Sequence, residues 1–244
     1  MTYKNIVFDL DDTLYDHLLP FKNSIIQYFP EIDISEIDIS EIDISEIELI
    51  YKRFRYWSDI AFPKYTNKQI SIEELRIFRC KQIISEFGSF SISDDLALSF
   101  QKTYEKELSS IILFPELKEI LEYCSVKRIP IGIITNGPVK HQLKKLSQLD
   151  VLKYFDKEKI IISQATGFQK PQIEIFNLAS KNFNFLPNQT LYIGDNFEND
   201  IEGSLNAGWK SIWFNHRKRK LPSDTKIHEV QTAKDLKELI YRLL

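Results

Sequence analysis

Three aspartates stand close together directly after a short apolar run. Asp9, Asp11 and Asp12 follow Ile-Val-Phe at positions 6–8, and this run predicts a strand buried on both faces, as in parallel sheets. Asp9 and Asp11 would leave that strand on the same side, at the carboxyl edge where open α/β sheets bind ligands. Carboxylates this close repel one another by about 1 to 4 kcal/mol per pair unless a cation intervenes. Because all the ligands are oxygens, the cluster indicates Mg²⁺ or Ca²⁺.

An Asp-rich turn that caps a helix would account for one of these residues but not for three. Further polar signals also follow apolar runs, and they are Thr135-Asn136-Gly137, Lys170 in a loop, and Gly194-Asp195 with Asp200. Each signal alone is typical of a turn, a solvated loop or a helix cap. Together, each after an apolar run, they predict one site at the carboxyl edge of a sheet.

The elements that must position these residues alternate between strand and helix. Apolar runs predict strands at 6–8, 131–134, 160–162, 191–193 and 211–214. Helical patterns fall at 115–127, 138–149, up to about 183, 197–207 with Gly208 as the stop, and 233–243. This alternation predicts an α/β fold, a Rossmann-like doubly wound parallel sheet with right-handed crossovers.

A block of helices interrupts the alternation after the first strand. It is predicted at 19–29, 46–61, 72–87 and 94–108, and Ser71 with Glu74 forms a capping box for the third helix. We therefore expect an α/β core of residues 1–16 and 111–244, with an inserted all-helical domain of residues 17–110. Within it, Glu-Ile-Asp-Ile-Ser occurs three times in tandem at 31–45. A period of five fits neither helix nor strand, so this repeat is interpreted as an acidic surface insertion.

Composition limits the classes of protein. The chain has 244 residues and a net charge of −3, without the basic surplus that binding to a nucleic-acid polymer requires. No apolar run approaches the roughly 20 residues that span a bilayer, and no secretory h-region follows Met1, so we expect a cytoplasmic protein with no membrane partner. Cys80 and Cys124 are expected to be buried apolar residues.

In these positions the sequence resembles the haloacid dehalogenase (HAD) superfamily of aspartate-nucleophile phosphatases. Its first motif, Asp-x-Asp-x-Thr, is matched by residues 9–13, and its second, a Thr or Ser that ends a core strand, by Thr135. The third motif, a Lys, is matched by Lys170, and the fourth, Gly-Asp-x-x-x-x-Asp, by residues 194–200. The helical block occupies the place where that family inserts a helical cap domain.

The resemblance implies a catalytic role for three residues. Asp9 would attack phosphorus and form a phosphoaspartyl intermediate. Asp11 would protonate the leaving alkoxide and then take a proton from the attacking water. Lys170 would screen the negative charge, and we expect Lys170→Ala to lower turnover strongly with little loss of fold.

The resemblance also implies how phosphate and metal are held. Phosphate oxygens would be bound by Thr13, Thr135 and the backbone N–H groups that follow it, including that of Asn136. Mg²⁺ would be held by the Asp9 carboxylate, the Asp11 backbone carbonyl and Asp195, and Asp200 would support these ligands from outside.

Within this superfamily, the sequence is similar to the pyrimidine 5′-nucleotidase branch. This resemblance implies a Mg²⁺-dependent phosphomonoesterase for a small phosphorylated metabolite such as a nucleoside 5′-monophosphate. The alternatives are a sugar-phosphate phosphatase, a phosphomutase, and a non-catalytic binding protein on the same fold. The acid at Asp11 argues against a dehalogenase, which lacks it.

Three stretches outside the motifs are given non-catalytic interpretations. Asp12 supports its turn, and the basic run at 216–220 is by default a solvated loop that could also attract anions. The aromatic residues between positions 51 and 65 are interpreted as the core of the helical domain rather than as a base-stacking surface.

Overall fold

The computed structural model describes residues 3–32, 46–220 and 227–244. The chain divides into two compact units, one of Met1–Asp16 with Ile111–Leu244 and the other of His17–Ser110. Most of the tandem repeat interpreted as a surface insertion, residues 33–45, lies outside the described residues.

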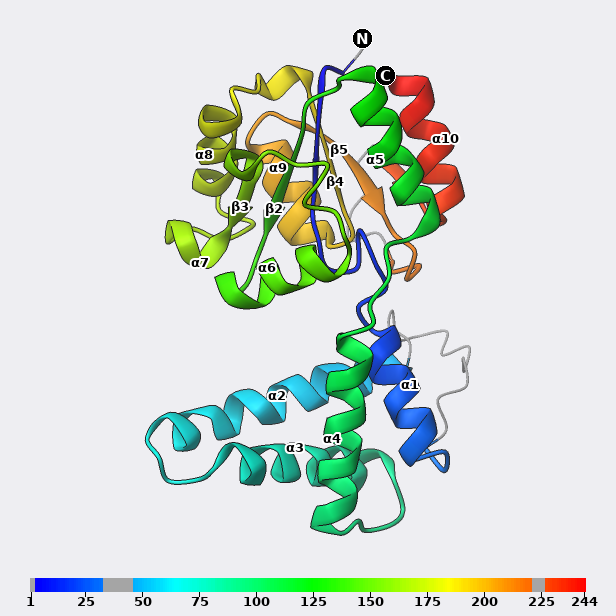
Figure 1. The fold of residues 1–244 in the computed structure, drawn as a ribbon, viewed down its shortest axis with the longest axis vertical. Coiled ribbons are helices and arrows are strands. Elements are labelled where there is room, and N and C mark those ends of the chain that lie inside the picture. The colour runs from blue at the N-terminus through cyan, green and yellow to red at the C-terminus, as the bar shows by residue number, and fades with distance from the viewer. Residues whose placement is uncertain (1–2, 33–45, 221–226) are drawn as a thin grey trace. The chain divides into compact units, whose positions relative to one another are not determined.

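The first unit is built on a sheet that has six strands within the described residues, in the order β3-β2-β1-β4-β5-β6 (Figure 1). The strands are β1 (Asn5–Phe8), β2 (Ile131–Thr135), β3 (Ile160–Ile162), β4 (Thr190–Gly194), β5 (Lys210–Phe214) and β6 (His228–Val230). All neighbouring strands pair in parallel, and β1 lies between β2 and β4. The predicted α/β class with a doubly wound parallel sheet is therefore confirmed.

Helices cover both faces of this sheet. They are α5 (Pro115–Lys127), α6 (Val139–Gln148), α7 (Ser163–Thr166), α8 (Ile173–Phe183), α9 (Gly203–Asn206) and α10 (Ala233–Leu243). Successive side chains of a strand point to opposite faces, so Ile6 and Phe8 enter one apolar core and Val7 enters another. The first core includes residues of α5 and α10, which contact each other, and the second includes residues of α8 (Figure 1).

Two predictions for this unit are wrong in part. The strand β6 was not expected, because its residues are polar or partly exposed and form no apolar run. The regular helix expected at 197–207 is instead a π-helical segment, Phe197–Glu202, followed by the short α9. Such π segments are frequent at functional sites, and this one carries Asp200. Gly208, with a φ of 80°, ends the segment as predicted.

The second unit is helical, with α1 (Leu19–Tyr28), α2 (Glu46–Thr66), α3 (Ile72–Phe87) and α4 (Asp94–Leu108). The predicted capping box of Ser71 and Glu74 is present. The helix α2 was expected to end near residue 61 but continues past Pro63. Pro63 has no backbone N–H to donate to the carbonyl of Asp59, so the helix continues with one hydrogen bond fewer.

The aromatic residues of α2 are divided between the core and the surface of the helical unit. Phe54 packs against Phe21 and Phe100 in the core, as predicted. Tyr56 and Phe62 are exposed, so the core interpretation does not extend to the whole stretch.

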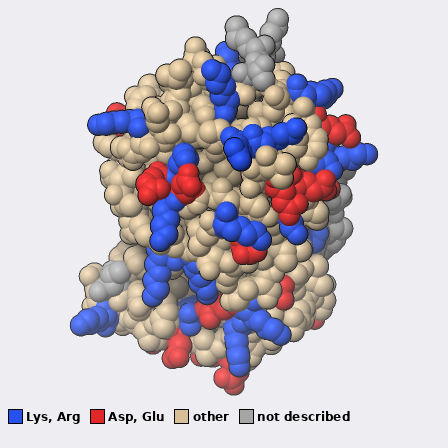
Figure 2. All heavy atoms as spheres, turned by 45° about the horizontal axis from the view of Figure 1, so that its top comes forward, with Lys and Arg blue, Asp and Glu red and all other residues tan. Residues whose placement is uncertain are grey.

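Charged side chains of both signs are interspersed over the face shown in Figure 2. This agrees with the net charge of −3 and with the absence of a basic surplus in the composition. None of the helices within the described residues is long and apolar enough to cross a membrane.

Candidate active site

The strand order brings the ends of β1, β2 and β4 together at the carboxyl edge of the sheet. Asp9 follows β1, Thr135 ends β2, and Asp195 follows β4. The backbone N–H of Asp9 donates to the carbonyl of Ile193 at 2.9 Å, which extends the pairing of β1 with β4 as far as the carboxylate. The sheet therefore places residues that are far apart in sequence next to one another.

Three buried carboxylates form a cluster at this edge. One oxygen each of Asp9, Asp195 and Asp200 lies within 4.8 Å of the others, and all three residues are buried. Gly194 is required beside Asp200, because a Cβ at position 194 would lie 2.4 Å from the Asp200 Cγ atom. The Gly-Asp spacing of the sequence thus has a steric cause.

A single buried lysine contacts two of these carboxylates. The Lys170 Nζ lies 2.5 Å from Asp9 Oδ1, 2.6 Å from Asp200 Oδ1 and 3.1 Å from the Tyr192 hydroxyl, with only 3% of its side chain exposed. A lysine before a proline is usually a solvated loop residue. Lys170 is instead buried and supplies the main positive charge beside the carboxylate cluster. Burial would lower the pKa of Lys170, but Asp200 and Asp9 hold it well above its usual value.

The carboxylates of the cluster lack sufficient counter-charge. Burial raises the pKa of Asp9 to about 7 against the opposing effect of Lys170, and the charges of Asp200 and Asp11 add to the rise. Burial, with repulsion from Asp12, Asp200 and Asp9, also raises the pKa of Asp195 well above its usual value. Buried oxygen donors whose negative charge is not fully offset are the donor set that suits a hard divalent cation.

The Asp11 carboxylate bonds elsewhere and is not part of this cluster. Lys145 Nζ lies 2.7 Å from both of its oxygens, the Tyr15 hydroxyl donates to Oδ1 at 2.5 Å, and Gln142 Nε2 donates to Oδ2 at 3.0 Å. Burial favours the neutral acid, but Lys145 and these hydrogen bonds keep the pKa of Asp11 below its usual value. The metal-holding group predicted at this residue is its backbone carbonyl, and these side-chain contacts do not involve that carbonyl.

The residues expected to bind phosphate lie at the same edge. The Thr135 hydroxyl accepts a hydrogen bond from Gln142 Nε2 at 2.6 Å. The Asn136 side chain donates to the carbonyl of Lys170 and accepts from its N–H, both at 2.9 Å, so it fixes the lysine loop. The Thr13 hydroxyl is buried, with no hydrogen-bond partner among the described residues.

The basic run after β5 is only in part a solvated loop, since Lys218 and Lys220 are exposed but Arg217 and Arg219 are not. Arg217 makes two hydrogen bonds to the buried Asp12 carboxylate, at 2.6 and 3.0 Å, and also bonds Asp16. Arg219 Nη1 lies 3.0 Å from Asp195 Oδ2. The solvated-loop interpretation is therefore wrong for Arg217 and Arg219, whose partners are distant in sequence, and holds for the exposed Lys218 and Lys220. Asp12, with a φ of 63°, holds its turn as expected and also anchors the run.

Lys145, Gln142, Tyr15 and Arg219 were missed as site residues. Lys145 and Gln142 lie in a helix that shows only amphipathic spacing, and their contacts to Asp11 join positions more than a hundred residues apart. The i, i+3 spacing of Gln142 and Lys145 in the helical pattern that follows Thr-Asn-Gly is the sequence signal that could have indicated these two residues.

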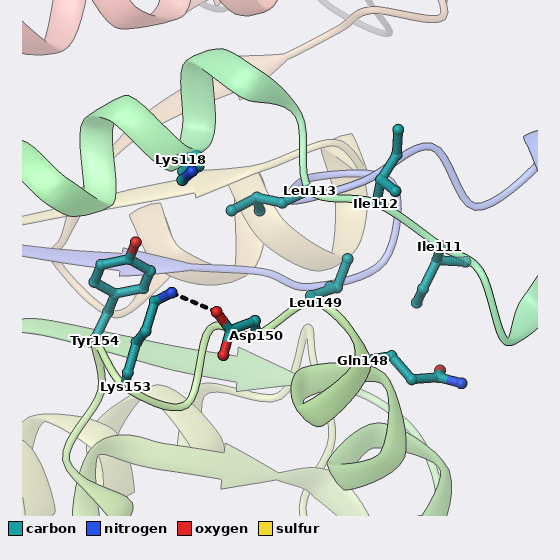
Figure 3. A pocket seen from close by; sticks show the side chains of 9 residues that line it. All are labelled: Ile111, Ile112, Leu113, Lys118, Gln148, Leu149, Asp150, Lys153 and Tyr154. Carbon is teal, nitrogen blue, oxygen red and sulfur yellow. Dashed lines mark hydrogen bonds and ion pairs between the residues drawn. The ribbon is translucent and has the colours of Figure 1, made fainter.

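A separate hollow of about 280 Å³ lies at the end of α6 (Figure 3). Its walls are largely apolar, with Ile111, Leu113 and Leu149 among them. Its charged groups are paired with one another or with neighbours, as the Lys153–Asp150 ion pair in Figure 3 shows. None of the acidic cluster lines it, so it is not part of the candidate active site.

A parallel sheet with an acidic cluster and a buried lysine at its carboxyl edge places the protein among the α/β hydrolytic enzymes of the HAD type. A family model described as "Haloacid dehalogenase-like hydrolase" matches residues 44–214, more than half of the chain. The chain belongs to this family.

Several characterised proteins are similar to this chain. A glyceraldehyde 3-phosphate phosphatase of Pyrococcus abyssi is 39% identical over 88 residues, which is 36% of either chain. The chain thus matches only about a third of the length of that relative. The pyrimidine 5′-nucleotidase PynA of Streptococcus pneumoniae is 25% identical over 238 residues, 97% of this chain and 94% of that protein.

The fold is also that of solved structures of the family. The HAD-hydrolase YfnB from Bacillus subtilis superposes with a TM-score of 0.61 and 20% identity, covering 99% of this chain and all of that one. At this level of identity the similarity describes the fold alone.

Proposed function

We propose that the protein is a Mg²⁺-dependent phosphomonoesterase that works through a phosphoaspartyl intermediate. The observation that carries the proposal is the contact of the buried Lys170 with Asp9 and Asp200, beside Asp195. A lysine that screens one carboxylate of a cation site favours attack by that carboxylate on an anionic phosphoryl group. Membership in the haloacid dehalogenase-like hydrolase family supports the same reaction class.

In this proposal Asp9 attacks phosphorus, and Lys170 offsets the charge that the phosphate brings. Asp11 gives a proton to the leaving oxygen and later accepts one from water. Phosphate oxygens are bound by Thr135, Thr13 and the backbone N–H of Asn136.

A bound Mg²⁺ supplies charge neutralisation and orientation of the phosphate. Asp9, Asp195 and the Asp11 carbonyl would hold it, and Asp200 would support them. The cluster of buried carboxylates, with the raised pKa values of Asp9 and Asp195, supports this assignment.

The proposed substrate is a small phosphorylated metabolite, in the first place a nucleoside 5′-monophosphate. The match to PynA over nearly the whole of both chains supports this choice. A sugar- or triose-phosphate is the second candidate, because two glyceraldehyde 3-phosphate phosphatases are 39% and 38% identical to this chain over 88 and 87 residues. We propose that the helical unit His17–Ser110 is the cap that selects among them, in a cytoplasmic enzyme that uses no nucleic-acid polymer and no membrane.

The test is phosphate release from a panel of nucleoside 5′-monophosphates, glyceraldehyde 3-phosphate and sugar 1-phosphates, with Mg²⁺ or with EDTA. We expect release with Mg²⁺ alone, and its loss in Asp9→Asn. Isomerisation of a sugar phosphate without net release would instead identify a phosphomutase. Binding of the compounds with neither reaction would identify a non-catalytic protein.

A further inference from the structure

We propose that Lys145 and Gln142 of α6 are positioning residues for the Asp11 carboxylate. The inference rests on the proposed function, in which Asp11 transfers the proton to the leaving group. These two side chains touch neither the acidic cluster nor Lys170 in the contacts described above. Both act through Asp11, and Gln142 also contacts Thr135.

The contacts to Asp11 fix its carboxylate from several directions. Lys145 Nζ reaches both oxygens at 2.7 Å, and Gln142 and Tyr15 each donate to one of them. Lys145 and Gln142 are three residues apart in α6, so they project from the same face of the helix. A carboxylate held in this way has little freedom to change rotamer.

Gln142 also joins the acid to the phosphate-binding edge. Its Nε2 lies 2.6 Å from the Thr135 hydroxyl and 3.0 Å from the Asn136 carbonyl, besides its contact with Asp11. An amide nitrogen has two hydrogens, so it serves two of these three acceptors at a time. Asp11 and Thr135 therefore share a buried donor, and the helix that follows the phosphate-binding strand sets the position of both.

Gly137 makes this arrangement possible. Its φ is +141°, and a Cβ there would lie 3.2 Å from the Gln142 side-chain carbon Cδ. Glycine is thus favoured by the backbone conformation, and a larger residue would also press against the Gln142 side chain. The Thr-Asn-Gly triplet is more than a turn, because its last residue admits the glutamine.

The position of Asp11 fits a proton-transfer role that needs such support. Its side chain is 33% exposed, against 8% for Asp9 and 1% for Asp200. A carboxylate at the accessible border of the site can meet a leaving group, but it is not immobilised by close packing. Lys145, itself 27% exposed, supplies the missing restraint.

The test compares two substrates that differ in their need for an acid. An alkyl phosphate expels a basic alkoxide that must be protonated, whereas p-nitrophenyl phosphate expels a stable phenolate. We expect Lys145→Met to lower kcat/KM for the alkyl phosphate at least about tenfold more than for p-nitrophenyl phosphate. This difference is a part of the rate enhancement that general-acid catalysis supplies. Lys145→Arg should restore most of the difference, and Gln142→Leu should show the same selectivity as Lys145→Met.

The matched control is Lys144→Met, which removes an exposed lysine from the same helix and should leave both rates unchanged. Asp11→Asn removes the acid itself, so the difference between its losses of kcat/KM for the two substrates is the upper limit for the other variants. Equal losses for the two substrates in Lys145→Met and Gln142→Leu would show a structural role only and would overturn the proposal. If the wild-type protein releases phosphate from none of the compounds, the proposed function is wrong, and the positioning role that rests on it is wrong as well.

Discussion

Removing the charge of Lys170 should affect both turnover and stability. Lys170→Met keeps the apolar stem but deletes the ammonium that contacts Asp9 and Asp200 at 2.5 and 2.6 Å. Loss of one electrostatic contact to a transferring group lowers kcat by about 10²–10³-fold. Because the lysine is almost fully buried, its loss also leaves two carboxylates without their partner, which costs about 3–5 kcal/mol. The sequence alone predicts little loss of fold for removal of this lysine, whereas its burial beside two carboxylates predicts a clear loss of stability.

The stability loss should depend on pH in a defined direction. The pKa of Asp9 is already raised from 3.8 to about 7 in the folded protein, so its contribution to stability is present at low pH and is lost as the pH rises through 7. Without Lys170 this pKa rises further. The variant should thus be destabilised more at about pH 8 than at about pH 5.5, where Asp9 carries a proton.

The assay is denaturant unfolding with EDTA at both pH values, together with phosphate release with Mg²⁺. Lys144→Met is the control for loss of a lysine without a buried partner. A kcat equal to that of the wild type in Lys170→Met would show that this lysine has no role in catalysis. An equal free-energy loss at both pH values would refute the argument from buried charge.

Three further changes test other parts of the structure. Gly194→Ala should displace Asp200 and weaken Mg²⁺ binding at least about tenfold by calorimetry, and unchanged affinity would show that the close approach is not needed. Arg217→Met leaves the buried Asp12 without its two-point partner and should lower the free energy of unfolding by about 2–4 kcal/mol; a loss under about 0.5 kcal/mol would mark a surface-type pair. Ser71→Ala removes a helix cap and should cost about 1 kcal/mol without changing kcat, so a large fall in turnover would contradict its purely structural role.

Local patterns predicted most of the elements and the residues at the ends of the strands. Apolar runs mark strands buried on both faces, and the capping box of Ser71 marks a helix start, because both depend on neighbours in sequence. The edge strand β6 was missed because its exposed residues carry no such pattern.

The partners of the site could not be predicted in the same way. The contacts of Arg217 with Asp12 and of Lys145 with Asp11 join residues that only the folded sheet brings together. A basic run and an amphipathic helix look the same in sequence whether their lysines and arginines face water or a carboxylate. Ion pairs between residues far apart in sequence are thus determined by the topology of the fold and not by the local sequence pattern.

The central place of β1 in the sheet also has a consequence for how the chain folds. Ile6 pairs with Ile131 on one side and with Leu191 on the other, so both ladders must close very long loops. Loop closure of this kind is slow, whereas the contacts within the helical unit are nearer in sequence and form sooner. We expect the helices of His17–Ser110 to be protected early in refolding, while the strand that delivers Asp9 acquires its neighbours last.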